Sequence, residues 1–372
     1  MIDLDAAEEV FAASVDGTVG IEEEFAILDP QTLDLVPRFE ELLEAAGPEL
    51  QDHITGELIT SEIEIVSGRG ENLADAVARQ SEARRRLFAH AARMGVRLGA
   101  TGTHPWADYR EQSNVDTEHY RRVVDGLGYA ARRNNTFSLH VHVGVQGADR
   151  AVRTCDRLRP LLPLLLAAGA SSPFVDGQDT LLHSARTETF TRTFPRCGVP
   201  DAYGSWDVYR DYIDLLVRTG SIVEYTQVWW SVRPHFAFGT VEMRICDVQA
   251  TDIESDALAA LIVGCIEQAV RDVADGVPAD DLPNRLIEEN LWRAIRYGMD
   301  ASFIDFETGE QVPAREALER AAAWAGVDPS FPERNGAQRQ RAMLADGASL
   351  REAYASIVEE TQRTYGRATP TS

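Results

Sequence analysis

Alternation between hydrophobic and polar residues predicts several β-strands in this chain. The first, TVGIEEEFAIL, is followed by a DPQT turn and a short return segment over residues 33–36. This pattern predicts a hairpin and therefore antiparallel pairing. The strand-like segments are residues 18–28, 53–66, 96–100, 136–145 and 226–247.

Longer segments with a helical spacing of hydrophobic residues separate these strands. They cover residues 38–46, 71–94, 116–133, 148–169 and 205–219, and the chain from about residue 252 onward is mostly helical. This arrangement predicts an α+β fold, in which one antiparallel β-sheet is backed by helices. Because no repeat or low-complexity linker interrupts the chain, we expect residues 1–372 to form a single domain.

The first strand carries three consecutive glutamates. Strand side chains alternate between faces, so Glu22 and Glu24 point one way, while Glu23 points the other way with Ile21 and Phe25. Two like charges on one face repel each other unless a cation lies between them. A solvated acidic face is the alternative interpretation.

The second strand segment, GELITSEIEIV, adds more carboxylates. Glu62 and Glu64 share one face, opposite Ile63 and Ile65. Glu57 has the other parity and joins them only if a bulge or turn intervenes. A charged edge that protects the sheet from aggregation is the alternative. A face with so many carboxylates cannot be a core, so we expect it to be open.

The segment SLHVHV places His140 and His142 on one strand face. A single histidine is more often structural, but two in this spacing favour a metal ligand or a phosphate contact. Copper and zinc sites share the same pattern.

Arginines provide a third kind of candidate residue. In RPHFAFGTVEMRICD, Glu242 and Arg244 point to the same side and Arg233 lies at the start of the segment. A structural salt bridge is the alternative for Glu242 and Arg244. In ENLWRAIRYG, Arg293 and Arg296 lie one helical turn apart and could clamp phosphate oxygens, or form a solvated basic face.

The charged composition narrows the classes of function. Asp and Glu number 60 against 36 Lys and Arg, the net charge is −24, and every one of the basic residues is Arg. Without lysine the chain cannot use a pyridoxal phosphate Schiff base, a Walker A lysine or the strand lysine of protein kinases. The acidic balance argues against nucleic-acid binding.

The cysteines and the hydrophobic runs suggest neither disulfides nor a membrane span. Cys155, Cys197, Cys246 and Cys265 are widely spaced and form no CxxC motif. The most apolar run, residues 158–170, is too short to cross a bilayer, and the acidic N-terminus does not resemble a signal peptide. We therefore expect a cytoplasmic protein that does not bind membranes.

Together these segments supply carboxylates and histidines from separate strands, with arginines nearby. Oxygen ligands suit Mg²⁺ or Mn²⁺, and arginine neutralises polyphosphate. The combination favours metal-assisted phosphoryl transfer on the open face of the sheet.

The same segments, in this order, resemble a known family. GIEEEF, GELITSEIEIVSG, GTHP, SLHVHVG, RPHFAFGTVEMRICD and ENLWRAIRYG are similar to the bacterial glutamate–cysteine ligase type 2 family of carboxylate–amine ligases, over residues 18–300. The resemblance implies a glutamine-synthetase-like catalytic sheet that uses ATP with two or three Mg²⁺ ions. It implies transfer of the γ-phosphoryl group to a carboxylate, typically that of glutamate, and displacement of phosphate by an amine, typically that of cysteine.

The resemblance also implies roles for individual residues. The residues that match metal ligands are Glu22, Glu24, Glu57, Glu64, His140 and Glu242. Arg244 matches the arginine that contacts phosphate or a substrate carboxylate. Arg233, Arg296 and His142 are expected to lie near it. We expect the two arginines to be catalytic groups and His142 to contact the nucleotide. No motif identifies the amine pocket, and a homodimer is expected from the resemblance alone.

Two other functions are compatible with some of these residues. A metal-dependent hydrolase could use the two histidines with a carboxylate to activate water, but it does not account for the number of carboxylates and arginines. A protein that binds a nucleotide without turnover would not need ligand-type residues in all five segments.

Overall fold

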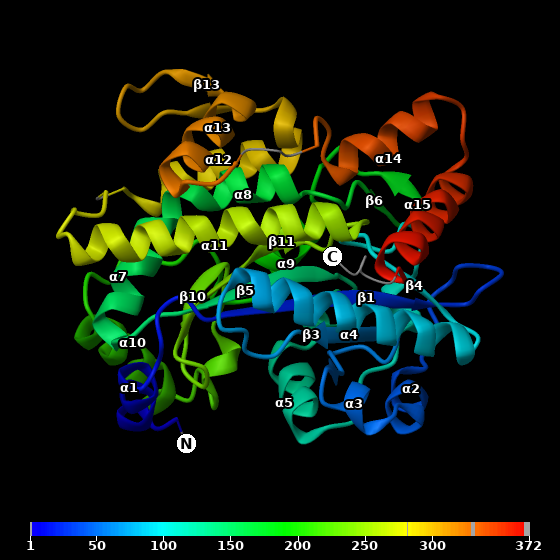
Figure 1. Cartoon of the computed structure of the whole chain (residues 1–372), viewed down its shortest axis with the longest axis horizontal. Coiled ribbons are helices and arrows are strands. Elements are labelled where there is room, and N and C mark those ends of the chain that lie inside the picture. The colour runs from blue at the N-terminus through cyan, green and yellow to red at the C-terminus, as the bar shows by residue number, and fades with distance from the viewer. Residues whose placement is uncertain (1, 281, 329–331, 368–372) are drawn as a thin grey trace.

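The computed structural model describes residues 2–280, 282–328 and 332–367 (Figure 1). Its main sheet contains seven strands in the order β10-β11-β5-β1-β3-β2, with β4 also paired to β1. Every pairing within this sheet is antiparallel, which confirms the predicted α+β fold. The strands of the sheet are β1 (Val19–Leu28), β2 (Ile54–Thr55), β3 (Glu62–Val66), β4 (Arg97–Gly99), β5 (Ser138–Gly144), β10 (Val232–His235) and β11 (Thr240–Asp247).

Outside the main sheet, α-helices and three small two-stranded sheets account for most of the regular structure in the described residues. The helices are α1 (Leu4–Ala12), α2 (Phe39–Ala45), α3 (Pro48–Gln51), α4 (Leu73–Arg93), α5 (Glu118–Leu127), α6 (Tyr129–Arg132), α7 (Ala148–Leu158), α8 (Leu162–Gly169), α9 (Ala185–Thr193), α10 (Trp206–Arg218), α11 (Asp252–Ala274), α12 (Asn284–Tyr297), α13 (Ala314–Ala325), α14 (Gly336–Ala345) and α15 (Leu350–Tyr365). The small sheets pair β6 (Phe174–Val175) with β7 (Gln178–Asp179), β8 (Cys197–Gly198) with β9 (Trp229–Trp230), and β12 (Ser302–Ile304) with β13 (Gln311–Pro313).

The predicted elements differ from the observed ones where local signals are weak. The return segment of the first hairpin is only a single bridge between Leu28 and Leu35. The helix predicted over 116–133 is divided at Gly128, whose positive φ of 56° is readily adopted by glycine. Helix α9 was not predicted, because the sequence ARTETFTRT is rich in β-branched threonine, which has a low helix propensity.

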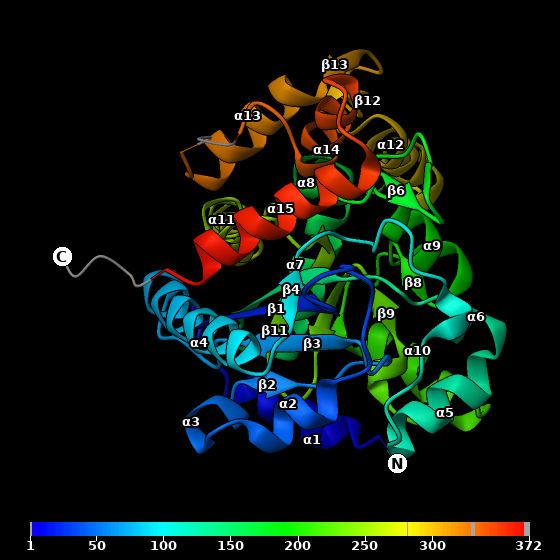
Figure 2. The ribbon, with the colours of Figure 1, turned by 90° about the vertical axis from the view of Figure 1, so that its right-hand side faces the viewer.

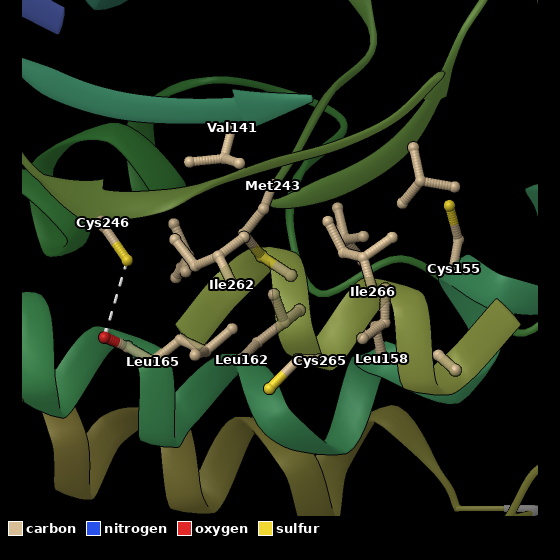
Figure 3. Packing of buried hydrophobic residues seen from close by; sticks show 14 of the residues in the cluster. Val141, Cys155, Leu158, Leu162, Leu165, Met243, Cys246, Ile262, Cys265 and Ile266 are labelled. Carbon is tan, nitrogen blue, oxygen red and sulfur yellow. Dashed lines mark hydrogen bonds between the residues drawn. The ribbon is translucent and has the colours of Figure 1, made fainter. Parts of the chain in front are cut away.

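One face of the sheet packs on helices and forms the hydrophobic core. Figure 3 shows Val141 of β5 and Met243 of β11 pointing toward α8 and α11, where they meet residues such as Leu162 and Ile262. All four of these side chains are completely buried. Alternation along each strand thus directs one set of side chains into this layer.

None of the four cysteines forms a disulfide. Three of them, Cys155, Cys246 and Cys265, are buried among these hydrophobic residues (Figure 3). Among the described residues, no helix combines the length and the apolar character needed to cross a bilayer.

A different set of helices packs over the opposite face of the sheet. Figure 2 shows α4 and α11 on one side of the sheet and α5, α6 and α9 on the other. The acidic face expected to be open is in fact partly covered by these segments, which leave a pocket of about 80 Å³ against it. This pocket and the strands beneath it contain most of the predicted site residues.

Candidate active site

Strand register places Glu22 at the centre of the acidic face. It lies opposite His140, its partner on β5. Nδ1 of His140 is 3.2 Å from one Glu22 oxygen, and Nε2 of His142 is 3.2 Å from the other. The same Nε2 is 3.8 Å from Glu242 on β11, so two histidines and carboxylates from two strands converge.

A second group of carboxylates lies along β1 and β3. Glu24 and Glu64 are direct partners across the two strands. Glu57 lies in the segment between β2 and β3, so an intervening loop resolves the parity problem and brings Glu57 to the same face. Tyr120 of α5 holds this loop by donating a 2.7 Å hydrogen bond to the carbonyl of Gly56.

These residues form three groups that could each hold a metal ion. Within each group the ligand atoms all lie within 4.8 Å of one another. Glu22 and Glu64 each belong to two groups, so neighbouring ions would share ligands. The groups are Glu22, His142 and Glu242; Glu22, Glu64 and His140; and Glu24, Glu57 and Glu64.

The donor atoms fit divalent cations. Nε2 of His140 and Nε2 of His142 are buried and have no hydrogen-bond partner within the described structure. Buried polar atoms are rarely left without a partner, so these nitrogens are suited to act as ligands. Carboxylate oxygens supply the other donors, which favours Mg²⁺ or Mn²⁺ over softer metals.

The pKa values show how much the carboxylates repel one another without cations. Burial and the neighbouring Glu22 charge raise the pKa of Glu64 well above its usual value. Burial and the charge of Glu24 raise the pKa of Glu57 to about 8. Burial alone would also raise the pKa of Glu22, but the charge of His142 and the hydrogen bond with His140 hold it well below its usual value.

Two arginines flank the last carboxylate of the site. Glu242 is fully buried and receives a 2.6 Å hydrogen bond from Nε of Arg233 and another from Arg244. Although burial opposes ionisation, these two guanidinium groups hold the pKa of Glu242 well below its usual value. Nε of Arg244 is buried and has no hydrogen-bond partner among the described residues, so this guanidinium has a donor available for a ligand.

Arg296 is not brought to this cluster. It lies on α12, which packs against α8 in the helical layer, and its guanidinium donates a 2.6 Å hydrogen bond to the carbonyl of Leu181. It also lies over the ring of Tyr297, 4.9 Å from the ring centroid. The prediction that grouped Arg296 with the catalytic arginines is therefore not supported by the geometry, because helical spacing gave no information on where α12 packs.

Arg186 is a site residue that the sequence patterns did not reveal. It extends from α9, lines the pocket, and donates 3.2 Å hydrogen bonds to the carbonyls of Arg244 and Ile245. Its Nε is buried without a partner in the described structure. Asp247 is 3.7 Å from this guanidinium and fixes its position. No motif surrounds Arg186, so only the packing of α9 identifies it.

The pocket joins the acidic face to a hydrophobic wall. Its lining combines charged groups of the sheet with aromatic and aliphatic side chains of α5, α9 and β9. The lining residues are Glu24, Glu57, Leu58, Glu62, His119, Tyr120, Val123, Asn134, Thr136, Ser138, Arg186, Phe190, Phe194, Trp229 and Arg244.

The chain is similar in sequence to proteins named as glutamate–cysteine ligases. The family described as Glutamate-cysteine ligase family 2 (GCS2) matches residues 18–360. A Rubrobacter xylanophilus protein named "Putative glutamate--cysteine ligase 2-2" is 39% identical over 366 residues, covering 95% of this chain and 94% of that protein. A Natronomonas pharaonis protein named "Glutamate--cysteine ligase" is 35% identical over 332 residues, covering 88% and 91% of the two chains.

The fold is shared with solved structures of much lower sequence identity. Glutamate–cysteine ligase of Francisella tularensis, solved in complex with AMP, has a TM-score of 0.69 at 11% identity and covers 95% of this chain and 90% of its own. A bifunctional glutathione synthetase of Pasteurella multocida has a TM-score of 0.69 at 14% identity, covering 97% and 54%. Since the family match and the sequence relatives both extend over most of the chain, this protein belongs to glutamate–cysteine ligase family 2.

Proposed function

We propose that this protein is an ATP-dependent carboxylate–amine ligase that forms a γ-glutamyl amide through an acyl phosphate. The supporting observation is the convergence of three potential metal-binding groups, two of them sharing Glu22, beside the paired arginines on one sheet face. Family membership supports the reaction type. Glutamate is the proposed carboxylate substrate, and cysteine or another amine is the proposed acceptor.

Divalent cations would be held by the six predicted ligands together with His142. When bound, Mg²⁺ or Mn²⁺ supplies neutralisation of the polyphosphate and orientation of its terminal phosphoryl group. The ligand residues are Glu22, Glu24, Glu57, Glu64, His140, His142 and Glu242.

The arginines have a separate role in the proposed reaction. Arg244 is held by Glu242 yet keeps Nε available for a phosphate oxygen or a substrate carboxylate. Arg233 is committed to Glu242 and to the carbonyl of Val228, so it positions Glu242 and does not meet substrate. A preorganised guanidinium stabilises charge that develops during transfer without having to reorganise.

The chemical steps follow from these roles. An oxygen of the γ-carboxylate of glutamate attacks the terminal phosphorus, and the bond between that phosphorus and ADP breaks. The amine nitrogen then attacks the acyl carbon and loses a proton, while phosphate leaves with the carboxylate oxygen that had attacked. The amide, ADP and phosphate are therefore formed in equal amounts.

Product analysis tests this proposal. Incubation with ATP, Mg²⁺, glutamate and an amine should give ADP and phosphate, and glutamate labelled with ¹⁸O in its γ-carboxyl group should transfer one label to phosphate. AMP and pyrophosphate would overturn the acyl phosphate route. Turnover that does not need ATP would indicate a hydrolase, and ATP binding without ADP formation would indicate a protein that only binds nucleotide.

A further inference from the structure

Strand β11 contains a β-bulge beside the candidate site. Its residues Arg244 and Ile245 lie together opposite a single residue of β5, His140, where the register of the two strands shifts. A bulge of this kind bends the strand and changes the face to which the following side chains point. Ile245 and Cys246 are consecutive, yet both are buried in the hydrophobic core (Figure 3). Bulges often lie next to active sites, where they redirect a side chain.

Arg186 of α9 binds the backbone of both bulged residues. Its two terminal nitrogens donate 3.2 Å hydrogen bonds, one to the carbonyl of Ile245 and the other to the carbonyl of Arg244. A bulge disrupts the hydrogen-bond ladder locally, and a guanidinium presents several donors in one rigid plane. One buried arginine side chain therefore serves the carbonyls of both residues that leave the regular ladder.

The first turn of α9 is attached to the end of the same strand. Ser184, the N-cap of α9, donates a 2.9 Å hydrogen bond to Asp247, the last residue of β11. Ser172 donates a 2.6 Å hydrogen bond to the other oxygen of Asp247 and accepts a 3.1 Å bond from the backbone N–H of Arg186. All four of these residues are buried, so Arg186 reaches the bulge from a fixed position.

The contacts at the bulge determine where the side chain of Arg244 begins. The amide of Arg244 donates a 2.8 Å hydrogen bond to the carbonyl of Ser231, the residue before β10, and its carbonyl accepts the bond from Arg186. Its guanidinium donates to Glu242 and lines the pocket over the acidic face. The backbone on both sides of the Cα atom of Arg244 is thus held in place.

We infer that Arg186 is a positioning residue that acts on the reaction through Arg244, by holding the bulge that directs the Arg244 guanidinium into the pocket. This inference rests on the proposed function, in which Arg244 contacts a phosphate oxygen or a substrate carboxylate. A displacement of about 1 Å in the groups of an active site can reduce the rate about 100-fold. Arg186 needs no contact with substrate to have such an effect.

A double-mutant cycle between Arg186 and Arg244 tests this role. Arg186→Lys keeps a positive charge but replaces the planar guanidinium, which reaches two carbonyls, with a single ammonium. The kcat/KM of this variant in the ligase reaction should fall about 10-fold. In the Arg244→Ala background the same change should lower kcat/KM by less than about 2-fold, because the side chain that Arg186 positions is absent. Radiolabelled ATP keeps the slowest variants measurable.

The kinetic constants separate positioning from a general loss of structure. Arg186→Lys should change kcat and the KM values for ATP and glutamate in the same proportions as Arg244→Lys does. A purely structural loss would lower the concentration of folded enzyme and leave the KM values unchanged. Circular dichroism and thermal melts give the folded fraction of each variant.

Two further variants complete the experiment. Arg186→Gln, which has a shorter and neutral side chain, should show the same coupling to Arg244 and provides a second test if Arg186→Lys does not fold. Arg192→Gln is the matched control, because Arg192 lies on the same helix but is exposed and pairs with Glu188 of that helix. It should keep the kcat/KM of its parent in both backgrounds.

The outcomes distinguish this inference from the proposed function. If the wild type forms no ADP from ATP, glutamate and any of a panel of amines, the proposed function fails and the inference fails with it. If the wild type is active but the losses from the Arg186 variants and from Arg244→Ala multiply, only the inference is overturned. Full kcat/KM in Arg186→Lys and Arg186→Gln would overturn it as well.

Discussion

On one face of β1, Glu23 is completely buried and both of its oxygens accept hydrogen bonds. Arg84 of α4 donates to both at 2.5 and 3.0 Å, and Gln80, Ser255 and Tyr365 complete the shell. On the other face, Glu22 and Glu24 lie among further carboxylates and two histidines. Adjacent residues of one strand therefore have opposite surroundings.

The contrast between Glu23 and the acidic face shows that one side of β1 stabilises the fold while the other carries the candidate site. Although burial opposes it, the Arg84 charge lowers the pKa of Glu23, so its ionised form is satisfied within the chain. Glu64, across from Glu24, has a raised pKa because burial and the surrounding carboxylates oppose its charge. Glu23 joins β1 to α4 and α11, whereas the raised pKa values of Glu57 and Glu64 show that the chain does not compensate their charges.

Removing the charge of Glu23 should have the largest effect, on folding. Glu23→Gln removes the buried carboxylate that pairs with Arg84, which keeps only its contact with the half-buried Asp256, and should reduce the free energy of unfolding by about 3–5 kcal/mol. Chemical denaturation measures this value. The double variant Glu23→Leu with Arg84→Met should recover part of the loss, and a loss below about 1 kcal/mol would contradict the structural role of the pair.

On the opposite face, Glu64→Gln should affect turnover and spare the fold. Glu64→Gln removes a ligand shared by two metal groups, so kcat should fall at least ~100-fold, equivalent to about 2.7 kcal/mol. Its metal-free melting temperature should not decrease, since burial and the neighbouring carboxylates already favour the neutral form of Glu64, which Gln resembles. Glu22→Gln and Glu242→Gln should also reduce kcat by orders of magnitude, and near wild-type kinetics in two of these three variants would contradict the metal site.

Variants of Arg244 test whether the acidic face of the sheet needs a planar guanidinium group or only a positive charge. Arg244→Lys should lower kcat/KM by about 10–100-fold, because ammonium cannot reproduce the fork of a guanidinium. Steady-state kinetics with varied ATP and glutamate measure the loss. Full activity in Arg244→Lys would show that only the positive charge of Arg244 is needed. Full activity in Arg244→Ala would show that Arg244 has no role in the reaction.

The two faces should also differ in how pH affects metal-free stability. Glu57 has a pKa of about 8 in the fold and a usual value of 4.5, so the folded state holds a proton that the unfolded chain has lost. Stability from this proton is complete below pH 4.5 and is lost as pH rises toward 8. Between pH 6.5 and 8 the loss should reach up to about 2 kcal/mol.

Glu62 and Glu64 also have pKa values well above the usual value, so their protons contribute in the same direction across this window. The buried histidines whose pKa values are lowered oppose this trend only at the lower end of the window, where histidines of the unfolded chain are still partly protonated. His142 has a raised pKa and contributes in the same direction as Glu57. Thermal melts in EDTA measure the slope, which Glu57→Gln should reduce and Mg²⁺ should flatten. Stability that rises with pH across the window would contradict the prediction.

Arg296 should show the smallest effect. Its contacts with Leu181 and Tyr297 lie in the helical layer, so Arg296→Ala should change kcat/KM less than about 2-fold and stability by about 0.5 kcal/mol. Kinetics and denaturation in parallel with Arg244→Ala measure the contrast. A loss of activity comparable to that of Arg244→Ala would restore Arg296 to the site.

Local alternation was sufficient to predict the sheet and much of the acidic face. Strand side chains have a period of two, so residue order alone separated Glu23 from Glu22 and Glu24, and placed His140 with His142. The extended segments and the main amphipathic helices were predictable for the same reason. The prediction of metal ligation and of catalytic roles for these residues stays a prediction until the variants are measured.

Only the tertiary structure decided which distant residues meet. Glu57 joins Glu64 through a loop, Arg186 arrives on a helix with weak local signals, and Arg296 packs away from the site. The pocket over the acidic face is built from α5, α9 and β9 as well as the sheet. Loop paths and helix packing depend on contacts between residues far apart in the sequence, and these contacts leave no periodic pattern to read.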